Sequence, residues 1–328
     1  MPANLPPQYF EAEKRYRQAE TPEEKIEALE EMLAIMPKHK GTDKLRAELR
    51  NKIAKFTKEA QKRPSVARRG GIYAIKKEGA GQVVLIGLPN VGKSQLLSAL
   101  TEALPEIADY PFTTKSPQLG MMKFENIQVQ LVDMPPIIDQ DAHPWFATVL
   151  RSADALLLLA DLSNEPIKQI EEVFEELQKR RIKPIGKEAK AEPEQWVFPK
   201  RTIILGNKSD LDPSGRKFAG LKEKYGGQFP VLPASAKTQL GLEELKREIF
   251  EALNIVRVYT KVPGGKPDLN DPMILKKGST VADAAEEIHK DFRHKLKYAQ
   301  IWGSGKFAGQ RVKRDHVLQD GDIIELHA

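Results

Sequence analysis

Apolar residues in this chain fall into short continuous runs and into helical stripes. Residues 83–86, 155–160 and 201–206 are largely apolar runs of strand length, and residues 127–132 alternate between apolar and polar side chains. Residues 242–253 instead repeat apolar positions every three or four residues, as a helix with one buried face does. Strands that alternate with helices in this way predict an α/β fold built on an open sheet.

The first 70 residues follow a different pattern, in which apolar positions recur at helical spacing among many charges. Thr21 and Pro22 mark the start of a helix, and Pro37 marks its end. A second helix should begin near Thr42. The apolar stripes of the two helices are Ile26, Leu29, Met32, Leu33 and Ile35, then Leu45, Leu49, Ile53 and Phe56. We therefore expect residues 1–70 to contain a helical hairpin.

The last part of the chain, residues 255–328, changes character again. Residues 258–262 and 273–275 predict a strand pair around a turn rich in Gly and Pro, and residues 323–326 predict a final strand. Between them, Thr280 followed by an acidic residue three positions later predicts the start of a helix. This order is typical of a small β-grasp module. Residues 183–196, by contrast, form a polar excursion to which we assign no chemistry.

A glycine-rich block, GLPNVGKS, stands between a predicted strand and a predicted helix at residues 87–94. A strand, this spacing and a helix together predict a loop whose backbone N–H groups surround phosphates. Lys93 would reach the β- and γ-phosphates, and the Ser94 hydroxyl would bind Mg²⁺. An ordinary glycine-rich turn would not explain Lys93 and Ser94 at this spacing. The residues predicted to bind phosphate are Gly87, Pro89, Asn90, Val91, Gly92, Lys93, Ser94 and Gln95.

Two later blocks predict that the nucleotide base is guanine. NKSD occupies residues 207–210, after a predicted buried strand, and SAK occupies residues 235–237. The Asp210 carboxylate can accept hydrogen bonds from N1–H and N2 of guanine, and adenine lacks that pair of donors. The residues predicted to bind guanine are Asn207, Lys208 and Asp210, then Ser235, Ala236 and Lys237, with the Ala236 N–H donating to O6. We expect residues 71–254 to form this GTP-binding domain.

Two further blocks, YPFTT at residues 110–114 and DMPP at residues 133–136, lie where a GTPase places its switches. Asp133 would hold Mg²⁺ through water. Thr113 or Thr114 would complete the metal site when the γ-phosphate is present, and spacing does not choose between these two adjacent hydroxyls, although we favour Thr114. The residues predicted to be catalytic are Lys93 and Thr114.

The DMPP block departs from the usual DxxG. The glycine of DxxG gives a backbone N–H to the γ-phosphate, and Pro136 has none. Ile137 then stands where many GTPases place a glutamine that orients water. We therefore expect slow intrinsic hydrolysis. Asn90 offers a compensating hypothesis, because an asparagine at this loop position is a K⁺ ligand in GTPases that use potassium; good loop chemistry is an equally good explanation for it.

Taken together, GLPNVGKS and YPFTT resemble the corresponding blocks of the Obg-like GTPases. The C-terminal region makes the chain similar to the DRG (developmentally regulated GTP-binding) branch, which ends in a TGS domain, a β-grasp module. The segments that carry this similarity include RVYTK at 257–261, LKKGST at 275–280, IHKD at 288–291 and DHVL at 315–318. The resemblance covers the chain from about residue 70 onward, and it implies GTP hydrolysis, Mg²⁺, K⁺ stimulation and work on ribosomes or translation.

Two departures limit what the resemblance transfers. DMPP replaces the DxPG of that branch, which bears on sensing of the γ-phosphate. The interval from Asp133 to Asn207 is also short for the extra subdomain that DRG proteins carry inside the GTPase domain. We interpret the chain as a trimmed relative whose partners need not be those of DRG proteins.

Charge adds a candidate partner. Residues 38–69 hold twelve lysines and arginines against three acids, although the whole chain has a net charge of only +6. Such a stripe can contact RNA phosphates, and the alternative is a solvated helix face. The chain contains no cysteine, which excludes disulfides and thiol catalysis. With no long apolar run and no signal-like N-terminus, we expect a cytoplasmic protein without membrane contact.

These patterns favour a P-loop GTPase with Mg²⁺ as a cofactor and K⁺ as a second, hypothetical one. Its expected partners are GTP and GDP, a ribosome or structured RNA, and a regulatory protein. A second hypothesis is a nucleotide-gated binding scaffold that hydrolyses little GTP, which Pro136 and Ile137 favour. A third, a P-loop ATPase or kinase, is disfavoured by Asp210.

Overall fold

The computed structural model describes residues 9, 12–13, 15–16, 22–36, 46, 48–53, 75–101, 106–107, 116–137, 144–187 and 197–327. The chain separates into two compact units, Met1–Ile72 and Tyr73–Ala328. In the ranges just given, no helix combines the length and the apolar character needed to cross a membrane.

The first unit is helical where it is described. Helix α2 covers Pro22–Ile35, so it begins at the predicted proline and ends before Pro37. Residues 46 and 48–53 are also helical, while Leu45 and Phe56 of the predicted second stripe lie outside the described residues. The helices meet in a small apolar core whose buried members are Tyr9, Ala12, Leu29, Met32, Met36 and Leu49.

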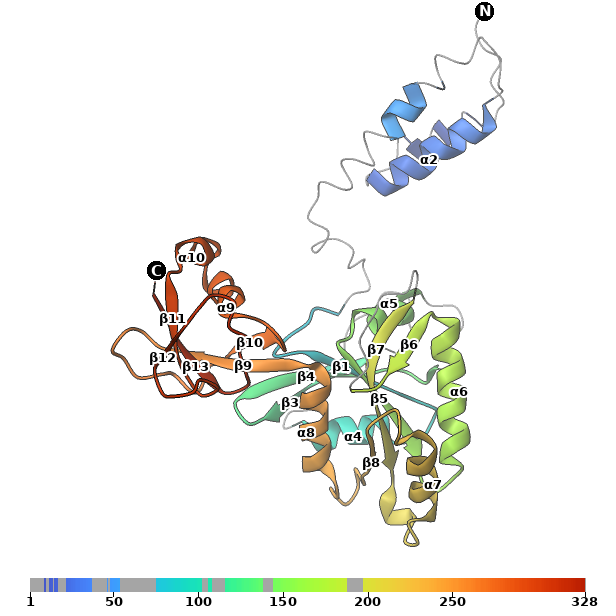
Figure 1. The fold of residues 1–328 in the computed structure, drawn as a ribbon. Helices are drawn as coiled ribbons and strands as arrows, with labels where there is room; N and C mark the ends of the chain where they lie inside the picture. The colour runs from blue at the N-terminus through green and yellow to red at the C-terminus, as the bar shows by residue number, and fades with distance from the viewer. Residues whose placement is uncertain are drawn as a thin grey trace, which may run out of the picture. The chain divides into compact units, whose positions relative to one another are not determined.

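The larger unit contains an eight-stranded sheet in the order β2-β3-β4-β1-β5-β7-β6, with β8 also paired to β7 (Figure 1). The pairs from β4 through β1, β5, β7, β6 and β8 are parallel, whereas β2, β3 and β4 are antiparallel neighbours. The strands are β1 Gln82–Gly87, β2 Glu106–Ile107, β3 Gln118–Phe124, β4 Ile127–Asp133, β5 Ala155–Asp161, β6 Ile182–Ile185, β7 Phe198–Asn207 and β8 Val231–Pro233.

Helices cover both faces of this sheet, which explains why its central strands read as continuous apolar runs. On β1, Val83 and Leu85 pack in one core with residues of α4 (Lys93–Leu100) and α8 (Leu242–Leu253). The intervening Val84 and Ile86 pack in a second core on the other face. That face is covered by α5 Pro144–Ser152, α6 Pro166–Lys179 and α7 Arg216–Tyr225. The predicted α/β class is confirmed.

One strand was not expected. Residues 182–185, at the start of the segment interpreted as a polar excursion, form β6 and pair with residues 198–201 of β7. Strand β8 pairs with residues 204–206 of the same strand. Strand β7 therefore has β5 along one edge, and β6 followed by β8 along the other.

The C-terminal sheet has the order β10-β9-β13-β11-β12, and β9 and β13, which come first and last in the chain, are parallel neighbours in it (Figure 1). Helix α9 begins with a reciprocal cap, in which the Thr280 N–H donates to Asp283 Oδ2 at 2.8 Å and the Asp283 N–H donates to Thr280 Oγ1 at 3.4 Å. The predicted β-grasp module is confirmed. Its elements are β9 Ile255–Thr260, β10 Met273–Lys276, α9 Val281–Ile288, α10 Lys290–Lys295, β11 Tyr298–Trp302, β12 Gln310–Val312 and β13 Asp322–His327.

Arg257 is one of the residues that join the two sheets of the larger unit; Asn126 is another, since its Nδ2 donates to the Tyr259 hydroxyl at 2.6 Å. Arg257, on β9, forms an ion pair with Glu125 and a hydrogen bond to Asn126 Oδ1 at 3.2 Å, both at the tip of the β3–β4 hairpin. Its Nη2 also donates to Asp320 Oδ2 at 2.7 Å, and its guanidinium lies 4.9 Å from the Phe250 ring on α8. The β3–β4 hairpin is thus fastened to the β-grasp module at its turn.

Candidate nucleotide-binding site

The GLPNVGKS loop lies between β1 and α4, and at both of its glycines a larger side chain would clash with a neighbouring residue. A Cβ on Gly92, whose φ is +91°, would lie 2.5 Å from Asn207 Nδ2. A Cβ on Gly87 would lie 2.8 Å from the carbonyl oxygen of Leu159. The amine of Lys93 folds back over the loop and donates to the carbonyls of Gly87 and Leu88 at 3.1 and 3.0 Å. The Lys93 amine therefore lies over the loop, where two loop carbonyls hold it.

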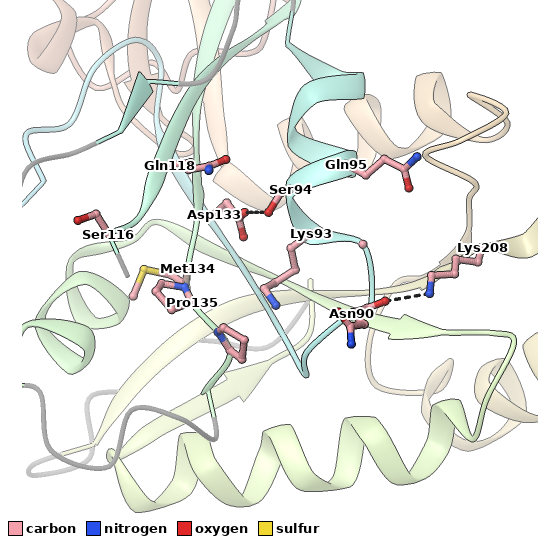
Figure 2. Close-up of a pocket in the computed structure, with 12 residues that line it drawn as sticks. Asn90, Lys93, Ser94, Gln95, Ser116, Gln118, Asp133, Met134, Pro135 and Lys208 are labelled. Carbon is pink, nitrogen blue, oxygen red and sulfur yellow. Dashed lines mark hydrogen bonds between the residues drawn. The ribbon is translucent and has the colours of Figure 1, made fainter. Parts of the chain in front are cut away.

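The other loop residues divide by exposure. Pro89 and Asn90 are exposed at the tip of the loop, and Asn90 has a left-handed φ of 62°. Val91 is buried and packs in the core under the loop. Gln95 is exposed on the first turn of α4 (Figure 2). The helix N-terminus faces the same side as the loop, where it favours an anion.

Ser94 and Asp133 meet as the sequence predicts for a metal site. The Ser94 hydroxyl donates to Asp133 Oδ2 at 2.5 Å (Figure 2). Asp133 Oδ1 is buried and has no hydrogen-bond partner among the described residues. Burial raises the pKa of the Asp133 carboxyl, although the Ser94 hydrogen bond and the charge of Lys93 counteract part of that rise. A hydroxyl beside an unsatisfied, desolvated carboxylate oxygen fits Mg²⁺, which prefers hard oxygen ligands.

Thr113 and Thr114 lie outside the described residues, so their predicted roles stay predictions. The segment after Asp133 is well buried: Met134, Pro135 and Ile137 all pack inward. Ile137 is fully buried in the same core as Phe146, and its carbonyl accepts a hydrogen bond from Arg180 Nη2 at 3.3 Å. The side chain at the usual glutamine position therefore points into the protein core.

The predicted guanine loops are linked to the phosphate loop through Asn207. This side chain is fully buried, its Nδ2 donates to the Val91 carbonyl at 2.8 Å, and its Oδ1 accepts the Ala236 N–H at 3.2 Å. The Ala236 N–H that we assigned to guanine O6 thus has a partner within the protein. Asn207 fixes the positions of the phosphate loop and the SAK loop relative to each other.

The remaining predicted guanine residues surround Asn207. Asp210 is exposed on a short 3-10 helix, Ser209–Leu211. The Ser235 hydroxyl is buried and accepts the Thr238 N–H at 3.1 Å, which shapes the SAK turn. Lys237 is exposed beside it. The Asp210 carboxylate is therefore open to solvent, so it is accessible to an incoming guanine base.

Sequence reasoning missed Asp161, the buried residue that ends β5. Its Oδ2 accepts a hydrogen bond from Lys208 Nζ at 2.7 Å, and Lys208 Nζ also donates to the Asn90 carbonyl at 2.8 Å (Figure 2). Burial by itself would raise the pKa of Asp161, but hydrogen bonds from Lys208 and Ser163 outweigh it and hold that pKa below its usual range. An acid at the carboxyl end of a buried parallel strand was the available signal, as it was for Asp133.

A cavity of about 490 Å³ lies over the phosphate loop and the Ser94–Asp133 pair (Figure 2). Two of its lining residues, Ser116 and Gln118, were not predicted; both follow the YPFTT block, and nothing in their spacing marks them. The residues that line the cavity are Asn90, Gly92, Lys93, Ser94, Gln95, Ser116, Gln118, Asp133, Met134, Pro135, Pro136 and Lys208.

Comparison with known proteins finds GTP-binding relatives. The family model of a 50S ribosome-binding GTPase matches residues 82–189, and that of the TGS domain matches residues 256–328. An uncharacterized GTP-binding protein of Methanocaldococcus jannaschii is 32% identical over 93% of this chain and 92% of its own length. Developmentally-regulated GTP-binding protein 2 of Homo sapiens is 27% identical over 92% of this chain and 98% of its own. These alignments span 365 and 363 positions, so both relatives carry segments that this 328-residue chain lacks.

A solved structure shares the fold. The crystal structure of a GTP-binding protein from Pyrococcus horikoshii is 20% identical, covers 75% of this chain and 99% of its own, and superposes with a TM-score of 0.52. The chain belongs to the family of GTP-binding proteins that combine a ribosome-binding GTPase domain with a C-terminal TGS domain, a family that includes the developmentally regulated GTP-binding proteins.

Proposed function

We propose that this protein hydrolyses GTP to GDP and phosphate, slowly when alone, and acts as a ribosome- or RNA-associated switch in translation or ribosome assembly. The observation that carries the proposal is the position of Asn207, whose side chain bonds both the phosphate loop and the SAK loop. That link brings phosphate-binding and base-binding groups to one edge of the sheet, as a nucleotide requires. We propose residues 1–70, 71–254 and 255–328 as the three functional parts.

Each predicted residue has a role in this proposal. Lys93 would release its loop carbonyls and stabilise charge that develops on the phosphates. Ser94, Asp133 and Thr114 would hold Mg²⁺, which neutralises phosphate charge when bound. Asp210 would select guanine.

The buried segment after Asp133 supports slow hydrolysis. Pro136 has no N–H to offer the γ-phosphate. Ile137 lies in the core and cannot orient a water molecule at the phosphates in this conformation. A partner that moves this segment, or a bound cation, would then be needed for rapid turnover. The same observation keeps a second candidate, a nucleotide-gated scaffold with little or no hydrolysis.

Asn90 is our candidate K⁺ ligand. It lies exposed at the tip of the loop and lines the cavity, so its side chain oxygen is accessible to a cation beside the phosphates. GTP turnover measured in potassium and in sodium buffers tests this role, with Asn90→Ala as the variant that should lose any difference. Equal rates of the wild type in both buffers would reject it.

The partner assignment rests on two observations. The matching GTPase family is described as binding the 50S ribosome. Residues 38–69, most of which lie outside the described residues, are strongly basic and suit RNA phosphates. We accordingly propose action in the cytoplasm, with a regulatory protein as a further partner.

Base selection can be tested by one isosteric change. Asp210→Asn replaces an acceptor with a donor, so binding should shift from GTP towards xanthosine triphosphate, whose C2 carries an oxygen instead of an amine. Asp212→Asn is a matched control, because the Asp212 carboxylate accepts the N–H groups of Lys217 and Phe218 at 3.1 and 3.0 Å. If Asp210→Asn still prefers GTP, Asp210 does not read the base.

The switch itself is tested by co-sedimentation with ribosomes in GDP and in a non-hydrolysable GTP analogue, together with multiple-turnover GTPase assays. A switch pellets with the analogue only, and its turnover rises with ribosomes. Equal pelleting in both nucleotides without turnover would favour the scaffold. The absence of pelleting in either state would reject a ribosomal partner.

A further inference from the structure

The two carboxylate oxygens of Asp161 have different partners. Oδ1 accepts the backbone N–H and the hydroxyl of Ser163, at 2.8 and 2.6 Å, and so shapes the turn after β5. Oδ2 accepts the amine of Lys208 at 2.7 Å and the amide of Asn164 at 2.8 Å. One oxygen therefore serves a local turn, and the other contacts the candidate nucleotide site.

Lys208 connects this carboxylate to the phosphate loop. Its backbone is left-handed, with φ 59°, and its side chain is 28% exposed. The amine that binds Asp161 also donates to the Asn90 carbonyl at 2.8 Å. The partners lie far apart in sequence and are brought together because Asp161 and Asn207 pair in register at the ends of β5 and β7.

A fixed lysine matters because a free one has many rotamers. Holding a lysine side chain in a single conformation costs conformational entropy, and a ligand that has to order it binds more weakly. In this structure the buried carboxylate of Asp161 orders Lys208 in the protein itself. Any nucleotide whose base lies under the Lys208 stem would find that stem already in place.

We propose that Asp161 is a positioning residue for nucleotide binding, acting through Lys208 and, through it, on Asn90. The inference rests on the proposed function of the site. Because Lys208 is predicted to contact the base side of the nucleotide, Asp161 stabilises bound GDP and bound GTP equally. Loss of a contact made equally before and during reaction raises KM and leaves kcat unchanged.

Asp161→Asn separates the two roles of this residue. If its remaining oxygen accepts the Ser163 N–H, the turn is kept and the new amide faces the Lys208 amine and the Asn164 amide. Three donors then meet at this point and Lys208 keeps only the Asn90 carbonyl as an acceptor, so its hold is weakened while the volume of the residue 161 side chain hardly changes. Asp161→Ser is a second variant, because a serine hydroxyl can support a similar turn but is too short to reach Lys208.

The test is a double-mutant cycle on nucleotide affinity. Dissociation constants for GDP and for a non-hydrolysable GTP analogue are measured for the wild type, Asp161→Asn, Lys208→Gln and the double variant. We expect Asp161→Asn to weaken both nucleotides about tenfold, equivalent to about 1.4 kcal/mol. In the Lys208→Gln background, the same change should have no further effect. Steady-state assays should show KM raised and kcat unchanged.

Asp322→Asn is the matched control for loss of a buried turn. Asp322 is a buried aspartate that accepts the Ser304 N–H and hydroxyl, both at 2.7 Å, in the TGS domain. Its substitution should lower the melting temperature and leave nucleotide affinity unchanged.

Three outcomes would overturn the inference. Wild-type affinity in both Asp161 variants would show that Asp161 has no role in binding. Additive losses in the double variant would show that it does not act through Lys208. If the wild type itself binds neither nucleotide, the proposed function fails, and this inference fails with it.

Discussion

Arg257→Ala tests how much the Arg257 side chain contributes to the coupling between the GTPase domain and the TGS domain. The guanidinium makes two hydrogen bonds to Asp320, at 2.7 and 3.1 Å, and its own side chain is only 11% exposed. Hydrogen bonds to charged groups contribute about 1.5–3 kcal/mol each, but solvent screening reduces the share of Glu125, which is 60% exposed. Contact with the Phe250 ring adds about 0.5–1 kcal/mol. We expect a loss of about 3 kcal/mol in the free energy of unfolding.

The assay is urea unfolding followed by fluorescence and circular dichroism. The wild type should unfold the two domains together, whereas Arg257→Ala should show an earlier transition for the TGS domain that GDP does not shift. Arg293→Ala is the control, because Arg293 is 46% exposed and pairs with Glu286 on the surface, where solvent screening leaves such a pair with little effect on stability. If the two variants lose equal stability and keep a single transition, Arg257 is an ordinary surface ion pair and the reasoning is wrong.

Three further predictions concern the site and its support. Asn207→Ala leaves the Val91 carbonyl and the Ala236 N–H without their partner, so it should cost about 2–4 kcal/mol and abolish the rise in melting temperature with GDP. Ser94→Ala should weaken Mg²⁺ binding about tenfold in isothermal titration, and EDTA should then change GTP affinity less than in the wild type. Burial, and to a smaller extent the charge of Lys77, lowers the pKa of Lys200 to about 8. Above that pH the unfolded chain binds more protons than the folded chain, so the free energy of unfolding should rise from pH 8 to 10. The rise should be smaller in Lys200→Met.

The nucleotide motifs could be predicted because each lies on consecutive residues at the end of a strand. The phosphate loop, Asp133 and the NKSD block needed only a strand before them and the rule that parallel strands end on one edge. Their mutual contacts follow from that edge. The direction of the Ile137 side chain did not follow, because the core residues that receive it come from a helix further along the chain.

Polar contacts between residues far apart in the chain could not be predicted from the sequence. Arg257 and Glu125 are separated by 132 positions, and Lys208 and Asp161 by 47. No local pattern marks such pairs, because either acid could equally be an ordinary surface charge. Strand β6 was missed for a different reason: Pro184 argues against a strand, yet β6 lies at the sheet edge, where the lost N–H is tolerated.

The pairing of β7 has a consequence for how a nucleotide would leave. This strand has neighbours along both edges, so its amides should exchange with solvent only when the whole domain opens. The β3–β4 hairpin, in contrast, is followed in the described sheet only by the two-residue β2. The NKSD block and the phosphate loop both follow strands paired along both edges, whereas Gln118 brings the weakly paired β3 to the rim of the cavity over the phosphates. Release of the nucleotide should therefore begin at the phosphates. A factor that speeds the exchange of GDP for GTP would act most effectively by separating β3 from its neighbours.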